Sequence, residues 1–186
     1  MIHVTNPPTP LDFILELLRP GDLVSHFLHG RGSGILDDSG RVKVAVREAR
    51  RRGILFDVAH GRNHVNFSVA RAAIEQGFFP DTISSDLTSG GAAGVVKDLP
   101  TTLSKFLNLG MPLEDVIRAA TATPARVIGR EGKLGTLKPG AIADAAVFEP
   151  EEGEFEFHDA DRNTLRGRHR LTPYLTLKGG ELRWQR

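Results

Sequence analysis

The sequence of 186 residues contains no cysteine, so disulfide bonds and thiolate metal sites are excluded. Any metal ion must therefore be held by histidine, a carboxylate or a modified side chain. No apolar run approaches the ~20 residues of a membrane-spanning helix. The first ten residues, MIHVTNPPTP, also lack the basic and apolar regions of a signal peptide. We therefore expect a cytoplasmic protein without a membrane partner.

The sequence has almost no excess of charge of either sign. Its net charge is +1, which gives no reason to expect nucleic acid as a partner. The basic run at 47–52 falls at a predicted helix C-terminus, where cations suit the helix dipole, so we interpret it as a solvated helix end.

Two enzyme signatures are also missing. The serines at 25, 84 and 85 are not in a G-x-S-x-G nucleophile elbow. The loop HGRGSG at 29–34 could bind an anion through backbone N–H groups, but it lacks the GxxxxGK[ST] spacing of a phosphate loop. A phosphate-binding α/β domain therefore stays open only as an alternative.

The first 120 residues alternate between short apolar segments and helical patterns, which indicates an α/β fold with a parallel sheet. Thr9 is predicted to cap the first helix, with Pro10 at its first position. Four strand–helix units amount to half of a (β/α)8 TIM-like barrel, and a complete barrel needs about 250 residues. The predicted strands are 2–4, 22–27, 54–59 and 82–87, and the predicted helices are 11–18, 42–52, 67–76, 101–109 and 113–122.

The pattern changes after Gly135 to short alternating or apolar runs separated by Gly and Pro, which predict β-strands of a separate layer. The sequence KGGE at 178–181 predicts a tight hairpin turn. We therefore expect two parts: residues 1–130 form the barrel portion, and residues 131–186 form a β-strand segment of a small β-sandwich.

Histidines and an aspartate recur at the ends of the four predicted strands: His3, His26, His60 and Asp86. Reactive residues of parallel βα folds lie at the C-terminal strand ends, so these side chains should share one rim. Imidazole and carboxylate are suitable ligands for Zn²⁺ and similar ions, and a carboxylate beside a metal can also transfer protons. Alternatively, each histidine is a structural residue and Asp86 is a helix cap or Asx-turn residue. We interpret the remaining histidines, at 29, 64, 158 and 169, as surface residues.

Four stretches make the sequence similar to a known group: residues 1–30, 54–87, 98–129 and 135–149, the last reading GTLKPGAIADAAVFE. Together they resemble the C-terminal half of an amidohydrolase-superfamily enzyme, and more closely the amidohydrolase/deacetylase family described as dihydroorotase-like. The resemblance implies that the chain contributes barrel strands 5–8, followed by strands of a small β-sandwich.

The resemblance also implies roles for individual residues. His3 and His26 would be metal ligands at the ends of strands 5 and 6, and Asp86 would be the strand-8 ligand and general base. His60 would contact substrate. In such enzymes a hydroxide held on one or two metal ions, often zinc, attacks an amide or ester carbonyl, and the aspartate passes the proton to the leaving group.

The sequence departs from the family by lacking a His-x-His pair and the strand-4 lysine that bridges two metal ions. We therefore expect at most the weaker half of a metal site, formed by His3, His26 and Asp86, for Zn²⁺, Mn²⁺ or Co²⁺. The open strand edges predict a second copy or a complementing N-terminal half as partner. The expected function is metal-dependent hydrolysis of a small N-acyl or related substrate; the alternative is a non-catalytic half-barrel that serves as an assembly module.

Overall fold

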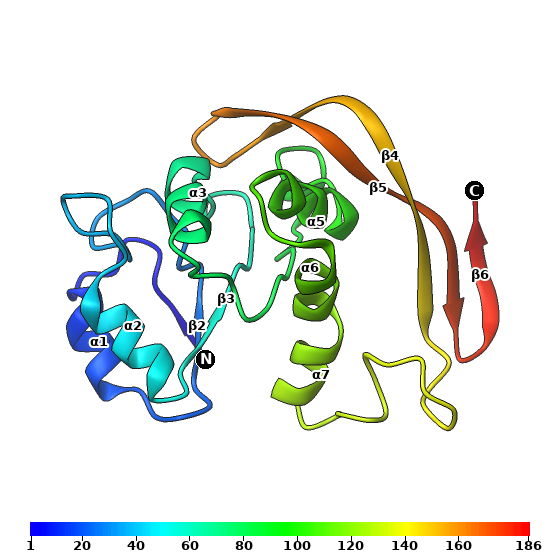
Figure 1. The fold of residues 1–186 in the computed structure, drawn as a ribbon, viewed down its shortest axis with the longest axis horizontal. Helices are drawn as coiled ribbons and strands as arrows, with labels where there is room; N and C mark the ends of the chain where they lie inside the picture. The colour runs from blue at the N-terminus through cyan, green and yellow to red at the C-terminus, as the bar shows by residue number, and fades with distance from the viewer.

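The computed structural model describes residues 1–186 and contains two three-stranded sheets with helices between them (Figure 1). The small parallel sheet lies next to α1 and α2, and α5, α6 and α7 occupy the middle of the molecule. A long two-stranded ribbon passes over α3 and α5 and continues down to a hairpin turn, from which β6 runs back up to the C-terminus. No helix is both long and apolar enough to cross a membrane.

The parallel sheet has the order β1-β2-β3 and contains β1 (Ile2–His3), β2 (Leu23–Ser25) and β3 (Leu55–Asp57). His3 is in register with Ser25, and Ser25 with Asp57, so the three strands end at one level. The strands are parallel because helical crossovers connect them, as the alternating sequence pattern predicts. The strand ends form the rim on which the candidate site is built.

The predicted fourth strand at 82–87 is wrong as a regular strand. Thr82 forms one parallel bridge with Asp57, and the segment continues extended, with His60 N donating to Ser84 O at 3.0 Å. The Asp57 carboxylate fastens this segment by accepting from Thr82 Oγ1 at 2.6 Å and from Ser84 Oγ at 2.8 Å. Side-chain hydrogen bonds thus replace part of a strand ladder, and on the other side Ile83 N donates to Ala119 O of α6 at 2.9 Å. Asp86, in the left-handed region, then ends the extended conformation.

Seven helices cover the strands and link the two sheets. Asn66 and Asp98 cap α3 and α5, the first by accepting from Ser68 N and Val69 N. The predicted helix at 113–122 is interrupted at Thr121, whose φ of −132° and ψ of −81° separate two helices. A short helix also forms in the Gly-rich stretch after 88. The helices are α1 (Leu11–Leu17), α2 (Val44–Arg51), α3 (Phe67–Glu75), α4 (Ser89–Ala92), α5 (Leu99–Asn108), α6 (Leu113–Ala120) and α7 (Ala122–Val127).

The predicted cap at Thr9 is also wrong. Pro10 occupies the N-cap position of α1 and makes no side-chain cap. Instead, Leu11 N donates to Ser33 Oγ at 3.0 Å, so a residue from a distant loop satisfies the free N–H that a local cap would have served.

One apolar core of 29 residues runs through both parts of the chain. Phe27, Phe56 and Phe78 meet edge to face at its centre, with ring centroids 5.1–6.0 Å apart. Phe157 and Leu165, from the ribbon, belong to the same core. The ribbon is therefore packed onto the helices, and the division between residues 130 and 131 stays a prediction.

The second sheet is antiparallel, with β4 (Ala145–His158), β5 (Thr164–Lys178) and β6 (Glu181–Gln185) in that order. Lys178 pairs with Glu181 across a two-residue turn, and Gly179 and Gly180 have φ values of 61° and 82°. Two positive φ values are typical of a type I′ hairpin, so the predicted turn is confirmed. The chain contributes one sheet layer here, and the expected sandwich stays a prediction.

Candidate metal centre

Three side chains from separate segments meet at the rim of the parallel sheet. One possible ligand atom from each of His26, His64 and Asp86 lies within 4.8 Å of the other two. His26 is buried, His64 is half-buried and Asp86 is exposed, so the group faces outward from the strand ends. His3 contacts His26 but is not a member of this group of three.

His26 follows β2 and is oriented by the backbone of the next rim segment. Its Nδ1 is 2.7 Å from Ala59 O, and its Nε2 is 2.9 Å from His3 Nδ1. A proton on Nδ1, donated to the carbonyl, leaves the Nε2 lone pair for an ion, an arrangement typical of metal-binding histidines. Two nitrogens on one tetrahedral zinc lie about 3.4 Å apart, close to the observed spacing. Burial lowers the pKa of His26, which favours the neutral imidazole that binds metals.

His64 corrects the prediction that this residue lies at the surface away from the site. Its Nδ1 is 2.7 Å from Thr5 Oγ1, and its ring lies over that of His26 with the centroids 3.9 Å apart. Burial, followed by the neighbouring His26, lowers the pKa of His64 to about 4. The available sequence signal was its place in the loop that follows β3, since such loops line the rim.

Asp86 lies opposite His64 across Gly61. A side chain added at Gly61 would place its Cβ 2.5 Å from Asp86 Oδ2 and would overlap the His64 ring. Gly61 also has a φ of 48°, which glycine adopts without strain. The alternative in which Asp86 caps the next helix is wrong, because Thr88 caps α4 by accepting from Gly91 N.

The backbone is strained at this rim. His26, Ala59 and Asp86 have φ values of 67°, 38° and 45°, and they are three of the six non-glycine residues with positive φ. Such conformations cost about 1–3 kcal/mol each and gather at functional sites, where the surrounding structure enforces them. The strain therefore marks the same place as the cluster of side chains.

Comparison with known proteins assigns the chain to a family. The sequence profile of the amidohydrolase family matches residues 25–181. The chain belongs to the amidohydrolase family. It is 38% identical to a deacetylase of Brucella anthropi, over 97% of the chain and 45% of that protein, and 38% identical to a deacetylase of Agrobacterium fabrum, over 97% of the chain and 44% of that protein. The chain thus spans about half the length of the curated relatives that it matches.

Solved structures of similar proteins agree. A crystal structure of an adenine deaminase superposes with a TM-score of 0.91 and 31% identity, over 97% of the chain and 49% of that structure. A dihydroorotase structure superposes with a TM-score of 0.86 and 36% identity, over 98% of the chain and 47% of that structure. The resemblance seen in the sequence is thereby confirmed, and the fold of this amidohydrolase chain corresponds to part of a barrel protein.

The residues on the rim fit a divalent cation. Imidazole and carboxylate ligands suit zinc. The Nδ1 of His26 is engaged by a carbonyl and that of His64 by a hydroxyl, so each ring would bind an ion through its Nε2. At His26 the ion would take the place of the hydrogen bond with His3 Nδ1. Gly61 provides room that any other residue would fill. The ligand atoms and the residues that orient them are therefore compatible with a bound divalent cation.

His60, the predicted substrate contact, lies away from this opening. Its side chain has no exposed surface, its Nδ1 is 2.9 Å from Gly61 O, and its Nε2 is 2.8 Å from Lys105 Nζ. Burial, followed by the charge of Lys105, lowers the pKa of His60 to about 4. The geometry therefore offers no surface at His60 for a substrate and indicates instead a packing role.

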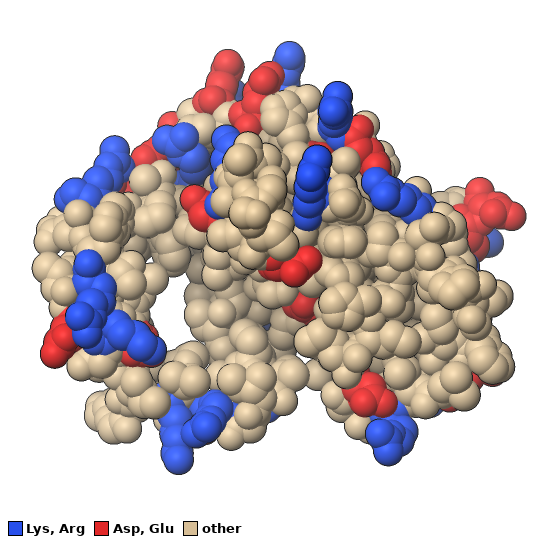
Figure 2. Space-filling model, turned by 180° about the vertical axis from the view of Figure 1, so that it is seen from behind, with Lys and Arg blue, Asp and Glu red and all other residues tan.

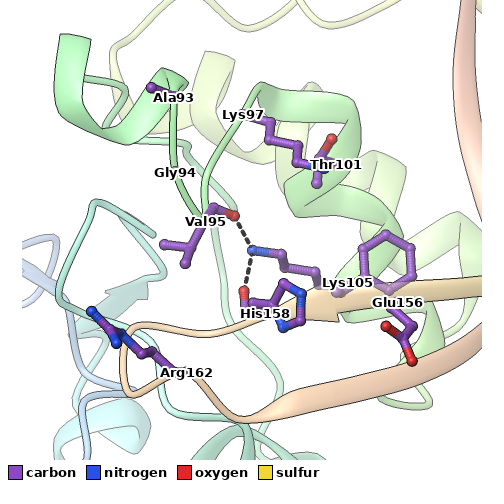
Figure 3. Close-up of a pocket in the computed structure, with 10 residues that line it drawn as sticks. Ala93, Gly94, Val95, Lys97, Thr101, Lys105, Glu156, His158 and Arg162 are labelled. Atoms are coloured by element: carbon purple, nitrogen blue, oxygen red, sulfur yellow. Dashed lines mark hydrogen bonds between the residues drawn. The ribbon is translucent and has the colours of Figure 1, made fainter.

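Lys105 is buried at the edge of a cavity of about 430 Å³ between the α4–α5 segment and β4 (Figure 3). Figure 3 shows its ammonium group directed at the carbonyl oxygens of Val95 and His158; the latter is 2.8 Å away. None of the rim residues lines this cavity. Burial lowers the pKa of Lys105 to about 7.

The other three histidines differ in their exposure to solvent. His158 and His169 are exposed, as predicted. The prediction is wrong for His29, which is 2% exposed, accepts from Arg31 N at 3.1 Å through Nδ1 and has no partner for Nε2. Its loop folds back beneath the rim, which the Gly-rich sequence did not reveal.

Proposed function

We propose that this chain provides half of the active site of a metal-dependent hydrolase that cleaves an amide, such as an N-acetyl group, or a related ester or C–N bond. The observation that carries the proposal is the convergence of His26, His64 and Asp86 on the strand-end rim of an amidohydrolase. The names of the relatives, deacetylase and dihydroorotase, favour a small N-acyl or cyclic amide substrate.

His3, His26 and Asp86 are the residues that we propose to hold the ion, with zinc as the first candidate. A bound divalent ion supplies a nucleophile at neutral pH and polarises the carbonyl. Asp86 is suited to hold the proton of the attacking water and to pass it to the leaving nitrogen, because its carboxylate is exposed at the opening. The buried side of His26 keeps water from the opposite face of the site.

We further propose that the barrel is completed by a second copy of the chain or by a complementing N-terminal half. β1 pairs only with β2, and the segment at 82–87 has β3 as its only strand neighbour, with Ile83 N donating to Ala119 O of α6 at 2.9 Å. No further strand pairs with either end of the parallel sheet. On the face shown in Figure 2, charged residues gather along the upper and left edges, a few acidic ones lie at the centre, and the right half is largely uncharged. Open strand edges are suited to cover by protein.

Acetate release from a panel of N-acetylated amino acids, measured with added Zn²⁺, tests the proposal. We expect turnover that Asp86→Asn loses and that Asp38→Asn, at an exposed position away from the rim, retains. The assay is run on fractions of defined mass from light scattering, because closing the barrel requires association. Turnover confined to a dimer supports closure by a second copy. Absence of turnover from a zinc-loaded dimer would favour the alternative, a non-catalytic half-barrel.

A further inference from the structure

His64 lies where a ligand would, although the family resemblance assigns it no role. It reaches the rim from the loop after β3, whereas His26 follows β2 and Asp86 ends the extended segment after 82. The three side chains thus come from three successive strand–helix units. Groups that converge from separate segments onto one point are the usual way in which a fold builds an ion site.

Thr5 fixes the orientation of the His64 ring. The distance of 2.7 Å between Thr5 Oγ1 and His64 Nδ1 is that of a hydrogen bond. When Nδ1 carries the proton and donates it to the hydroxyl, the lone pair of Nε2 is free. The ring is also held against His26 at an interplanar angle of 31°. Partners of this kind orient metal-binding histidines and fix their tautomer.

Gly61 places the free edge of His64 beside the Asp86 carboxylate. The position that a Cβ would take at Gly61 is 3.2 Å from His64 Nε2 and 2.5 Å from Asp86 Oδ2, so both potential donors lie over the same glycine. Ligand atoms on a tetrahedral zinc lie about 3.4 Å apart. The candidate ligand atoms of His26, His64 and Asp86 lie within 4.8 Å of one another, so they would have to move closer together to bind one zinc ion.

We propose that His64 is a protein ligand to a divalent cation that it shares with His26 and Asp86. His64 joins the three ligands proposed above, His3, His26 and Asp86, so the chain offers four ligands of its own and needs neither the His-x-His pair nor the lysine. An ion at His26 Nε2 replaces the proton that His3 donates there. The inference uses the same rim as the proposed function, but it concerns ion binding and does not require turnover.

Zinc affinity of the purified chain, stripped of metal with a chelator, tests this inference. Isothermal titration with Zn²⁺ should give one ion per chain. His64→Phe keeps an aromatic ring over His26 but loses the nitrogen, and we expect its affinity to fall by about 100-fold or more. Thr5→Val should weaken binding by about 10-fold, in the range for partners that orient a ligand. His169→Phe, at an exposed position on β5, is the matched control.

The visible absorption of bound Co²⁺ provides a second readout, because it would not change on substitution of His64 if that residue had only a structural role. We expect the visible absorption of the Co²⁺-loaded chain to change in His64→Phe and to stay the same in His169→Phe, with circular dichroism showing that all variants are folded. Equal zinc affinity in the wild type and in folded His64→Phe would overturn the inference, as would no zinc binding by the wild type. Zinc binding that depends on His64 without any turnover would support it while counting against the proposed function.

Discussion

Replacing Lys105 with Met should change how the stability of the chain depends on pH. Lys105 is 1% exposed, and its ammonium group has three acceptors, one for each proton: His60 Nε2, Val95 O and His158 O. These acceptors belong to the loop after β3, the segment before α5 and the end of β4. Lys105 therefore connects the rim, the helices and the antiparallel sheet through a single buried charge.

The size of the effect follows from two lowered pKa values. Burial lowers the pKa of Lys105 from 10.5 to about 7, and burial together with Lys105 lowers that of His60 from 6.5 to about 4. Between the folded and unfolded pKa of each group the unfolded chain binds more protons, so stability rises with pH in both windows. At 1.36 kcal/mol per pKa unit, His60 contributes roughly 3 kcal/mol between pH 4 and 6.5, and Lys105 contributes roughly 5 kcal/mol between pH 7 and 10.5.

Urea denaturation from pH 4.5 to 9.5 measures this dependence. The wild-type free energy of unfolding should rise across both windows, and Lys105→Met should lose the rise above pH 7. The variant also leaves three buried acceptors unpaired, at about 1–3 kcal/mol each, so it should be less stable at pH 9. Lys138→Met, at an exposed lysine that does not act on the pKa of Lys105, should keep the wild-type profile. A Lys105→Met profile parallel to the wild type above pH 7 would refute the reasoning.

Three further substitutions test other parts of the structure. Gly61→Ala should weaken zinc binding by about 10–100-fold in a folded protein, because the added methyl displaces Asp86 and His64; an unchanged affinity in titration calorimetry would contradict this. Phe56→Ala should cost about 3–5 kcal/mol of unfolding free energy in denaturant, since the ring is fully buried in the aromatic centre of the core, and a loss below about 1 kcal/mol would show that the core relaxes around it. Asp98→Ala should cost about 1 kcal/mol in the same assay by removing the cap of α5, and no change would mean that water replaces the cap.

Features set by neighbouring residues could be predicted from the sequence. The parallel order of β1, β2 and β3 follows from the alternation of apolar segments with helical ones, and the Gly179–Gly180 turn follows from the demand for positive φ. The presence of His26 and Asp86 on one rim follows from their places at the ends of the second and fourth predicted strands. Each of these inferences needs only a short window and the geometry of a sheet.

Features set by distant contacts could not be predicted in this way. The cap of α1 comes from Ser33, in a loop more than twenty residues away. The position of His64 depends on the left-handed turn at Gly61 and on the hydroxyl of Thr5, 59 residues earlier in the chain. The buried position of His60 depends on its contact with Lys105. The sequence pattern of the helix that contains Lys105 does not indicate that this charge is buried. In each case a side chain finds its partner only after the elements have packed.

Backbone strain supports the metal rim independently of any distance between side chains. Asp and His tolerate the left-handed region better than most residues, so Asp86 or His26 alone would be weak support. Ala59 has no polar side chain that could stabilise that conformation locally, and its carbonyl is the acceptor for His26 Nδ1. The strained peptide at Ala59 thus orients the imidazole of His26, which belongs to the group with His64 and Asp86. A rim built only for stability would need neither the strained alanine nor the buried histidine that it orients, and this coincidence favours a functional centre over a set of structural histidines.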